Sequence, residues 1–443
     1  MSEPMLGVLM LALLCIAIMI GFPTAFTLMA LGVFFGYLGF GDLVFPLLVQ
    51  RAFAVMTNDV LIAVPLFVFM GYIIERAGTL DRLFRSIQIA LGPIRGSILL
   101  ATLATCTVFA TATGIVGASV TLIGLLALPA MIRAKYDIRL STGTIAAGGT
   151  LGILIPPSVL LILYGAVAGV SVPRLYAGAF GPGLMLSSLY LLYILFRVNT
   201  DPNAAPPLPK EERTFPVGVI VKNLVTSFLP LTFLIGAVLG SILMGVATPT
   251  EAAALGAIGG LILAYAYGKL TFQNLKESVF LTARTTAMVG WLFVGSSLFA
   301  AVFARLGGSA LIEQWVLSLG LTPFQFFWLA QIMIFLLGWP LEWTEITIIF
   351  LPLFLPLLKT YDIDPLFFGI MTALNQQTSF LSPPVAMSAF YLKGVAPRHV
   401  TINQIFRGMY PFLAIQVVAM AVLYYWPDLA LWLPQAIYGS STR

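Results

Sequence analysis

Long apolar stretches alternate along the chain with short breaks that are charged or marked by Gly and Pro. Most stretches are about 16 to 22 residues long, which suits helices that cross a hydrocarbon core of roughly 30 Å. They lack the strict alternation of a membrane β-barrel strand. About ten are long enough to span a bilayer, and a few more are shorter. The pattern therefore predicts an all-α polytopic membrane protein.

Composition supports this class. Of the 443 residues, 60% are hydrophobic and only 9% are charged, far from the balance of a soluble domain. The net charge of +5 would suggest a nucleic-acid partner for a soluble protein. Here we expect a lipid bilayer and no nucleic acid, and the position of each charge indicates orientation. Cys15 and Cys106 lie in apolar stretches without the spacing of a metal site.

One apolar region, at about 96–132, carries positive charge on both sides. Its two apolar pieces are joined by small residues from Thr111 to Ser119, and Arg95 and Arg133 flank the outer ends. A single crossing would leave one flank poor in Lys and Arg, so the charges favour a re-entrant helical hairpin based on the cytoplasmic side. Its tip would lie near mid-membrane.

The next region, at about 140–169, contains the run Gly148-Gly149-Thr150-Leu151-Gly152-Ile153-Leu154-Ile155-Pro156-Pro157-Ser158. The two prolines leave carbonyls without helical partners, and the glycines allow other groups to approach the backbone closely. In lipid, unpaired backbone is tolerated only where it is buried in protein or lines a cavity. We therefore predict a broken helix that contributes to a binding site.

A polar, proline-rich run at 199–222 divides the chain into two halves, 1–198 and 223–443. Motifs of the first half recur in order in the second: Gly21 and Thr24 as Gly245 and Thr248, Tyr136-Asp137-Ile138 as Tyr361-Asp362-Ile363, Pro156-Pro157 as Pro383-Pro384, and Tyr164 as Tyr391. Such an ordered set indicates an internal repeat. The second half should contain a hairpin at about 324–358, a broken helix at about 365–392, and a terminal helix.

Threading the chain through a membrane in this way leaves all but five of the 22 Lys and Arg on the cytoplasmic side. The exceptions are Arg51, Arg174, Arg305, Lys359 and Arg443. Arg305 and Lys359 flank the second hairpin, which must therefore enter from the face opposite to the first. The repeats are predicted to be inverted, and inverted repeats with broken helices are typical of secondary transporters.

The second half contains the same two features as the first. Its hairpin tip runs from Gly338 to Glu345, and its helix break runs from Asn375 to Pro384. Where tips and breaks meet, free carbonyls suit a hard cation such as Na⁺, and half-helix N-termini suit a substrate anion. Glu342 and Glu345 are predicted at membrane depth, where a charge is costly and usually functional. Glu342 is the stronger functional candidate. A structural role stays open for both, with Glu345 capping the following helix.

Enzymatic chemistry finds little support in the sequence. Glu342 and Glu345 could act as an acid pair only if the tip is helical, which Pro340 disfavours. The sole histidine, His399, lies in a short polar stretch that we expect at the surface, and Glu251 reads as a helix-start residue after Pro249. We find no nucleophile with a base and no phosphate-binding glycine loop. We predict a transporter and not an enzyme.

Three stretches resemble the large membrane subunit (DctM type) of tripartite ATP-independent periplasmic (TRAP) transporters, and the resemblance extends over nearly the whole chain. They are Phe109-Ala110-Thr111-Ala112-Thr113-Gly114-Ile115-Val116-Gly117-Ala118-Ser119, the run from Gly149 to Ser158, and Asn375-Gln376-Gln377-Thr378-Ser379-Phe380-Leu381-Ser382-Pro383-Pro384. Two departures stand out. This chain has Gly117-Ala118-Ser119 where Gly-Ser-Ser is common, and Glu342 where Asp is usual.

The resemblance implies an elevator-type carrier of the bacterial inner membrane, driven by a Na⁺ gradient. It also implies a small membrane subunit and a periplasmic binding protein that delivers an organic acid anion. One implied sodium site comprises Thr113, Gly114, Gly117, Gly149 and Thr150. The other comprises Gly338, Trp339, Thr344, Asn375 and Thr378. The implied substrate-facing residues are Thr113, Ser158 and Glu342.

An alternative within the transporter class remains open at this point. A stand-alone Na⁺-coupled carboxylate carrier of similar architecture would need neither the small subunit nor the binding protein. Adjacent reading frames for a small membrane protein and a secreted binding protein are expected only for the tripartite system.

Overall fold

The computed structural model describes residues 3–114, 116–209, 215–384 and 386–439, and every regular element in these ranges is helical. The predicted all-α class is confirmed. The first half contains α1 (Glu3–Ile20), α2 (Thr24–Phe40), η1 (Gly41–Leu43), α3 (Val44–Met56), α4 (Asp59–Arg76), α5 (Thr79–Ala90), α6 (Ser97–Thr113), α7 (Val116–Arg133), α8 (Ile138–Thr150), η2 (Leu151–Ile153), α9 (Val159–Ala168) and α10 (Val172–Thr200).

The second half is also entirely helical in its described regular elements, and η3 and η4 in it are π-helical turns. It contains α12 (Val217–Asn223), η3 (Leu224–Phe228), α13 (Leu229–Leu243), α14 (Pro249–Ala266), α15 (Phe272–Arg305), α16 (Gly308–Ser318), α17 (Pro323–Leu337), α18 (Trp343–Glu345), η4 (Ile346–Phe350), α19 (Leu351–Thr360), α20 (Pro365–Leu381), α21 (Met387–Val395), α22 (Ile402–Tyr425) and α23 (Asp428–Tyr438).

Eight of the described helical segments are long and apolar enough to cross a membrane, or up to nine if α4 and α5, bent by 63°, count as one span. The sequence pattern indicated about ten. The difference arises because α1, α6, α9 and α17 are apolar but too short to cross alone. Each ends directly before a glycine, namely Gly21, Gly114, Gly169 and Gly338. Gly21, Gly114 and Gly169 have positive φ, a backbone conformation that glycine adopts readily at helix ends, whereas Gly338 keeps a helical φ of −67.

A shift of 227 positions, which is the separation of Thr150 and Gln377, relates the two halves around their hairpins and breaks. It relates the 18 residues of α7 to the 18 residues of α18, η4 and α19, with Pro129 and Pro356 inside them. It also relates Asp137 to Asp364. These carboxylates accept hydrogen bonds from the first turns of α8 and α20, as N-caps do.

This shift corrects one of the sequence matches. The triplets Tyr136-Asp137-Ile138 and Tyr361-Asp362-Ile363 lie two positions out of register with it, so the counterpart of Asp137 is Asp364. Asp362 instead has φ +52, the left-handed backbone that Lys135 adopts with φ +58. What repeats is a left-handed turn followed two residues later by an N-cap. The matching Tyr-Asp-Ile triplets overlap this feature but are not equivalent in position.

The two hairpins are held at opposite ends of an antiparallel helix pair, α4 and α15. Tyr72 Oη lies 3.5 Å from Thr285 Oγ1, and Arg76 forms an ion pair with Glu277. α5, which follows α4, packs on α6 and α7 of the first hairpin, while α16, which follows α15, packs on α19 of the second. Inverted repeats require this arrangement.

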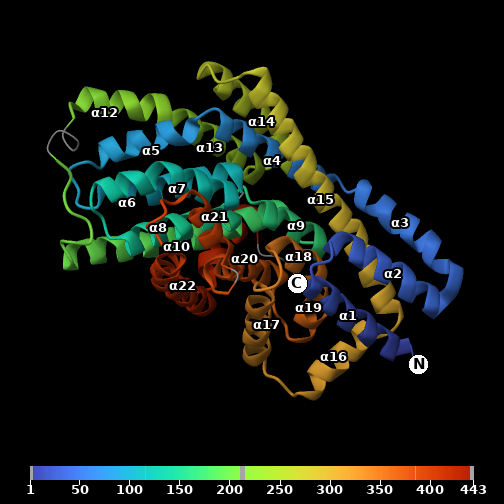
Figure 1. Cartoon of the computed structure of the whole chain (residues 1–443). Helices are drawn as coiled ribbons and strands as arrows, with labels where there is room; N and C mark the ends of the chain where they lie inside the picture. Colours follow the sequence, from blue (N-terminus) through green and yellow to red (C-terminus); the bar gives the residue numbers. More distant parts are fainter. Residues whose placement is uncertain (1–2, 115, 210–214, 385, 440–443) are drawn as a thin grey trace.

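The helices gather in two groups (Figure 1). In the group that we call the frame, α14 packs along α4 and α2 along α15. In the group that we call the inner module, α6 to α9 and α17 to α22, both hairpins and both broken helices pack together, and α22 crosses α8 and α20. At the crossing of α8 and α22, a Cβ on Gly143 would lie 2.1 Å from the carbonyl oxygen of Gly408.

Gly143→Ala should therefore lower the melting temperature of the protein in detergent, because relieving such an overlap costs roughly 1–3 kcal/mol. Gly240→Ala is the matched control. Gly240 also lies inside a helix, α13, but apart from the neighbouring backbone of that helix no described heavy atom lies within 4 Å of where its new methyl group would be. Equal melting temperatures for the two variants would contradict the close crossing of α8 and α22.

Candidate functional site

The two helix breaks contact each other inside the inner module. Thr150, the last residue of α8, donates hydrogen bonds to the carbonyl oxygen of Ala147 at 2.8 Å and to Oε1 of Gln377 in α20 at 3.2 Å. Both side chains are fully buried. Because Thr150 and Gln377 are equivalent positions in the two repeats, the pseudo-two-fold axis passes between them.

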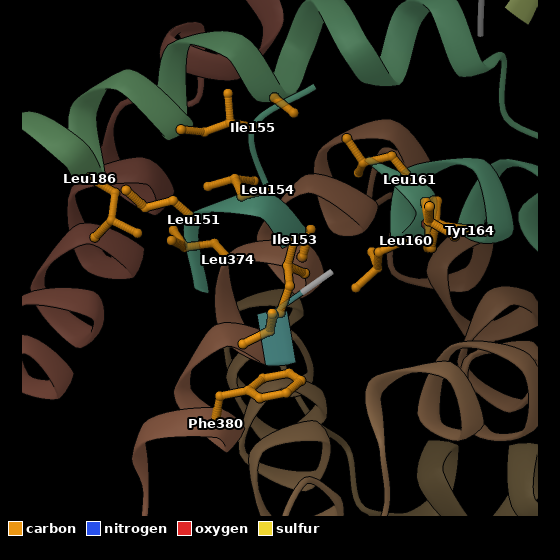
Figure 2. Packing of buried hydrophobic residues seen from close by; sticks show 14 of the residues in the cluster. Leu151, Ile153, Leu154, Ile155, Leu160, Leu161, Tyr164, Leu186, Leu374 and Phe380 are labelled. Carbon is orange, nitrogen blue, oxygen red and sulfur yellow. The ribbon is translucent and has the colours of Figure 1, made fainter. Parts of the chain in front are cut away.

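Apolar side chains surround the first break. Figure 2 shows this packing for Leu151, Ile153, Leu154, Ile155, Leu374 and Phe380. Within the break, Ser158 Oγ donates to the carbonyl oxygen of Ile153, and the Tyr176 hydroxyl donates to the carbonyl oxygen of Ser158 at 3.3 Å. Two carbonyl oxygens that lack helical partners near the prolines thus accept hydrogen bonds inside the protein, as backbone at membrane depth must.

Each hairpin meets the break of its own half through a glycine. A Cβ on Gly149 would lie 2.3 Å from Cγ2 of Val120 in the first hairpin. A Cβ on Gly338, at the second tip, would lie 1.8 Å from Oγ of Ser379 in the second break. Any larger residue would force the tip and the break apart, so both glycines have a steric reason to be there.

A network of buried amides lies beside the second break. Nδ2 of Asn375 donates to the carbonyl oxygen of Gln331 at 2.7 Å and to its Oε1 at 2.9 Å. This use of the nitrogen leaves Oδ1 of Asn375, which accepts one long hydrogen bond of 3.3 Å from Thr378, as the group able to meet a cation. Sequence reasoning missed Gln331, although an amide in the middle of the apolar helix α17 was a usable signal.

Glu342 and Glu345 form a reciprocal capping box at the start of α18, in which the Glu342 N–H donates to Oε2 of Glu345 at 3.1 Å. Glu345 also accepts a hydrogen bond from Thr24 Oγ1 in the first turn of α2. α2 begins after Pro23, without an acidic residue in its first turn or a side-chain cap of its own. Glu345 therefore brings a carboxylate from the inner module to the N-terminus of this frame helix, where the helix dipole favours a negative charge.

Its counterpart α14 caps itself. Thr248 and Glu251 form a capping box within that helix, so the interpretation of Glu251 as a helix-start residue agrees with its contacts. Sequence reasoning could not find the bond from Thr24, because it joins residues 321 positions apart.

Two cavities flank the second hairpin tip, and Glu342 and Trp343 line both. The larger, of about 420 Å³, lies between the tip and the turn that joins α1 to α2. The smaller, of about 190 Å³, lies between the two hairpin tips, α4 and α15. The polar side chains around the smaller cavity are Tyr72, Thr285, Glu342, Trp343, Thr344 and Tyr391.

The structure brings some of the predicted site residues to these cavities. Those lining the smaller cavity are Gly114, Gly117, Glu342 and Thr344. Those lining the larger are Gly338, Trp339 and Glu342. Others are buried at the breaks and line neither: Gly149, Thr150, Ser158, Asn375 and Thr378. Thr113 ends α6, but its side chain lies outside the described residues.

Comparison with known proteins places these elements in a family. Residues 8–429 match the family described as tripartite ATP-independent periplasmic transporter, DctM component. The chain belongs to this family. The C4-dicarboxylate TRAP transporter large permease protein DctM of Pseudomonas aeruginosa is 30% identical over 389 residues, which cover 87% of this chain and 88% of the relative.

A second DctM-family relative is named for a different substrate. The ectoine/5-hydroxyectoine TRAP transporter large permease protein UehC of Ruegeria pomeroyi is 28% identical over 429 residues, which cover 94% of this chain and 96% of the relative. Among solved structures, the YdaH transporter of Alcanivorax borkumensis matches with a TM-score of 0.62 and 15% identity, over 98% of this chain and 99% of that one. This last likeness concerns the fold alone.

Family membership decides the class of the protein. This DctM-family chain is the large permease subunit of a TRAP transporter, a multi-pass protein of the bacterial inner membrane. It is a transporter and not an enzyme. The resemblance drawn from the tip and break motifs is thereby confirmed.

The contact between the breaks can be tested by a double-mutant cycle. Thr150→Val should destabilise the protein, because leaving a buried partner without its hydrogen bond costs about 1–3 kcal/mol. Combined with Gln377→Leu, it should give a coupling free energy of about 0.5–3 kcal/mol, measured by reversible denaturation in Na⁺-free detergent.

Thr144→Val provides the control for this cycle. Thr144 is also buried in α8, but its hydroxyl donates to Leu140 of the same helix at 2.8 Å. Its effect should therefore add to that of Gln377→Leu without coupling. A Thr150 cycle as additive as the Thr144 cycle would contradict the contact between the breaks.

Proposed function

We propose that this subunit imports a small organic acid anion in symport with Na⁺, that the acid is delivered by a periplasmic binding protein, and that an elevator motion carries it across. The observation that carries the proposal is the convergence of both hairpin tips, a helix break and the frame around the cavity of about 190 Å³. Helix breaks and tips of this kind serve ions and substrates in secondary transporters.

The side-chain oxygens at the second break support Na⁺ as the coupling ion. Oε1 of Gln376, Oγ of Ser379 and Oγ of Ser382 are buried without a hydrogen-bond partner among the described residues. Such atoms are costly to bury unless a cation or water meets them. Together with carbonyls of the unwound backbone, neutral oxygens of this kind fit a hard cation such as Na⁺.

We assign the two sodium sites to the two pairs of tip and break. One would use Thr113, Gly114, Gly117, Gly149 and Thr150, and the other Gly338, Trp339, Thr344, Asn375 and Thr378. The proposed substrate-facing residues remain Thr113, Ser158 and Glu342. Of these, Glu342 lines both cavities, whereas the Ser158 hydroxyl donates to Ile153 inside the break. Ser158 would thus act by holding the break and not by direct contact, unless the break opens.

The proposed partners follow from the family and its relatives. A tripartite transporter implies a small membrane subunit beside this one and a periplasmic binding protein. The two relatives described above are named for a C4-dicarboxylate and for ectoine. A shared architecture can therefore serve different substrates, and we expect the periplasmic binding protein to set much of the selectivity.

An elevator motion requires that the inner module can be displaced against the frame. What supports it is the small number of polar links between the two groups at the site among the described residues. The smaller cavity separates both tips from Tyr72 and Thr285 of the frame, while α4 also packs on α6 and α9. The hydrogen bond from Thr24 to Glu345 joins the second tip to α2 and would have to break during the motion.

The coupling ion is tested in proteoliposomes that contain both membrane subunits, with the binding protein outside. Uptake of a radiolabelled acid should require an inward Na⁺ gradient. Added Na⁺ should also raise the melting temperature of the purified subunit, because an ion that binds only the folded state at 100 times its Kd adds about 2.7 kcal/mol. Uptake that persists when K⁺ replaces Na⁺ would refute the coupling. Uptake without the binding protein would favour a stand-alone carrier.

The elevator motion is tested by cross-linking Thr24→Cys to Glu345→Cys with a short bifunctional thiol reagent, in a background without Cys15 and Cys106. Cross-linking should abolish uptake relative to the untreated double variant, since it fastens the second tip to the frame. The control is Asp59→Cys with Thr250→Cys. These two frame residues share a hydrogen bond of 2.9 Å, and cross-linking them should leave uptake intact. Full uptake by the cross-linked Thr24 and Glu345 pair would refute the motion.

A further inference from the structure

Two tyrosines occupy equivalent positions in the repeats but have different surroundings. Tyr164, in α9, is fully buried, and its hydroxyl donates to the carbonyl oxygen of Pro365 at 2.6 Å. Tyr391, in α21, is partly exposed and lines the smaller cavity. Its hydroxyl makes no hydrogen bond to the residues that the structure describes. One copy of the tyrosine thus holds the fold, and the other is turned toward the site.

The ring of Tyr391 rests on the start of α7. A Cβ on Gly117, the second residue of that helix, would lie 3.1 Å from Cζ of Tyr391. Because Cζ carries the phenolic oxygen, the hydroxyl lies beside the first turn of α7. The leading N–H groups of a helix have no partners within the helix. A hydroxyl donor and the positive end of an 18-residue helix therefore meet at the cavity wall.

Glu342 gives another part of the same cavity the opposite character, because it contributes a carboxylate at the start of α18. A substrate carboxylate placed there would be repelled, whereas at the α7 end it would meet N–H groups and a hydroxyl. The cavity thus favours one orientation of an organic acid, with its carboxylate toward Gly117 and Tyr391.

We propose that Tyr391 is a substrate-binding residue, and that its hydroxyl donates a hydrogen bond to a carboxylate of the transported acid at the N-terminus of α7. This inference rests on the proposed function. Tyr72 and Thr285 also line the cavity, but they belong to the frame and lie 3.5 Å from each other. Tyr391 belongs to the inner module and stays beside both hairpin tips when the module moves. It can therefore accompany the substrate through the cycle.

The experiment compares Tyr391→Phe with Tyr164→Phe in the reconstituted complex. The probe is the first acid that the wild-type complex imports with Na⁺ from a panel of radiolabelled succinate, malate, N-acetylneuraminate and ectoine. Loss of a hydrogen bond to a charged group should raise KM roughly tenfold or more in Tyr391→Phe and leave the maximal rate within about twofold. Preference for the acid over its carboxamide analogue should fall by a similar factor.

Tyr164→Phe is the matched control, because it removes the same atom from the equivalent position. It should leave KM unchanged and lower the melting temperature, since the carbonyl of Pro365 loses its donor. The Na⁺ concentration for half-maximal uptake, at saturating substrate, should not change in Tyr391→Phe. If Tyr391→Phe yields too little folded protein, Gly117→Ala provides a second variant, because its methyl group would displace the ring. Gly117 is also assigned to a sodium site, so KM is measured at saturating Na⁺, where it should still rise.

Three outcomes would overturn the assignment: an unchanged KM in Tyr391→Phe, a higher KM with an unaltered preference for the acid over the carboxamide, or an equal rise in KM for Tyr164→Phe. A wild-type complex that imports none of the four probes with Na⁺ would instead refute the proposed function for those acids. The two failures are therefore distinguishable.

Discussion

Every peptide group at membrane depth must find a partner within the protein, and the two helix breaks are where this chain meets that demand by tertiary contact. The first break is closed by its own hydroxyl and carbonyl groups and by apolar packing, and Thr150 ties it to the second. The second retains buried oxygens that are not paired among the described residues. The two breaks thus differ in how far their polar side chains are paired among the described residues.

The hairpins depend on the breaks in turn. A tip that ends in mid-membrane must cover its exposed backbone, and here each hairpin does so by pressing on the broken helix of its own half at a glycine. This contact makes each hairpin and its break one mechanical unit, and the contact of the breaks joins the two units. Contacts at the breaks therefore link both hairpins within the inner module, and its second tip reaches the frame through a side-chain contact at Thr24.

The helical class and the locations of hairpins and breaks could be predicted from the sequence, because Gly, Pro and clustered charge act locally on helix ends and topology. Side-chain partners could not, because they depend on which distant segments meet. The hydroxyl of Ser158 donates to Ile153, Asn375 donates to Gln331, and Glu345 accepts a hydrogen bond from the Thr24 hydroxyl of α2. The register of the repeat could not be predicted from the sequence either, because helix caps and turns are preserved where residue identities differ. Asp364, the N-cap of α20, is the example.

The pair on the pseudo-two-fold axis has a consequence for the origin of the fold. An axis between two identical subunits brings a residue against its own copy. A residue that meets its own copy cannot pair a hydroxyl donor with an amide oxygen, as Thr150 and Gln377 do. The unlike pair of Thr150 and Gln377 is open only to repeats that have diverged within one polypeptide. Fusion of the two halves thus allowed a heterotypic centre that a symmetric dimer of half-sized proteins could not have built.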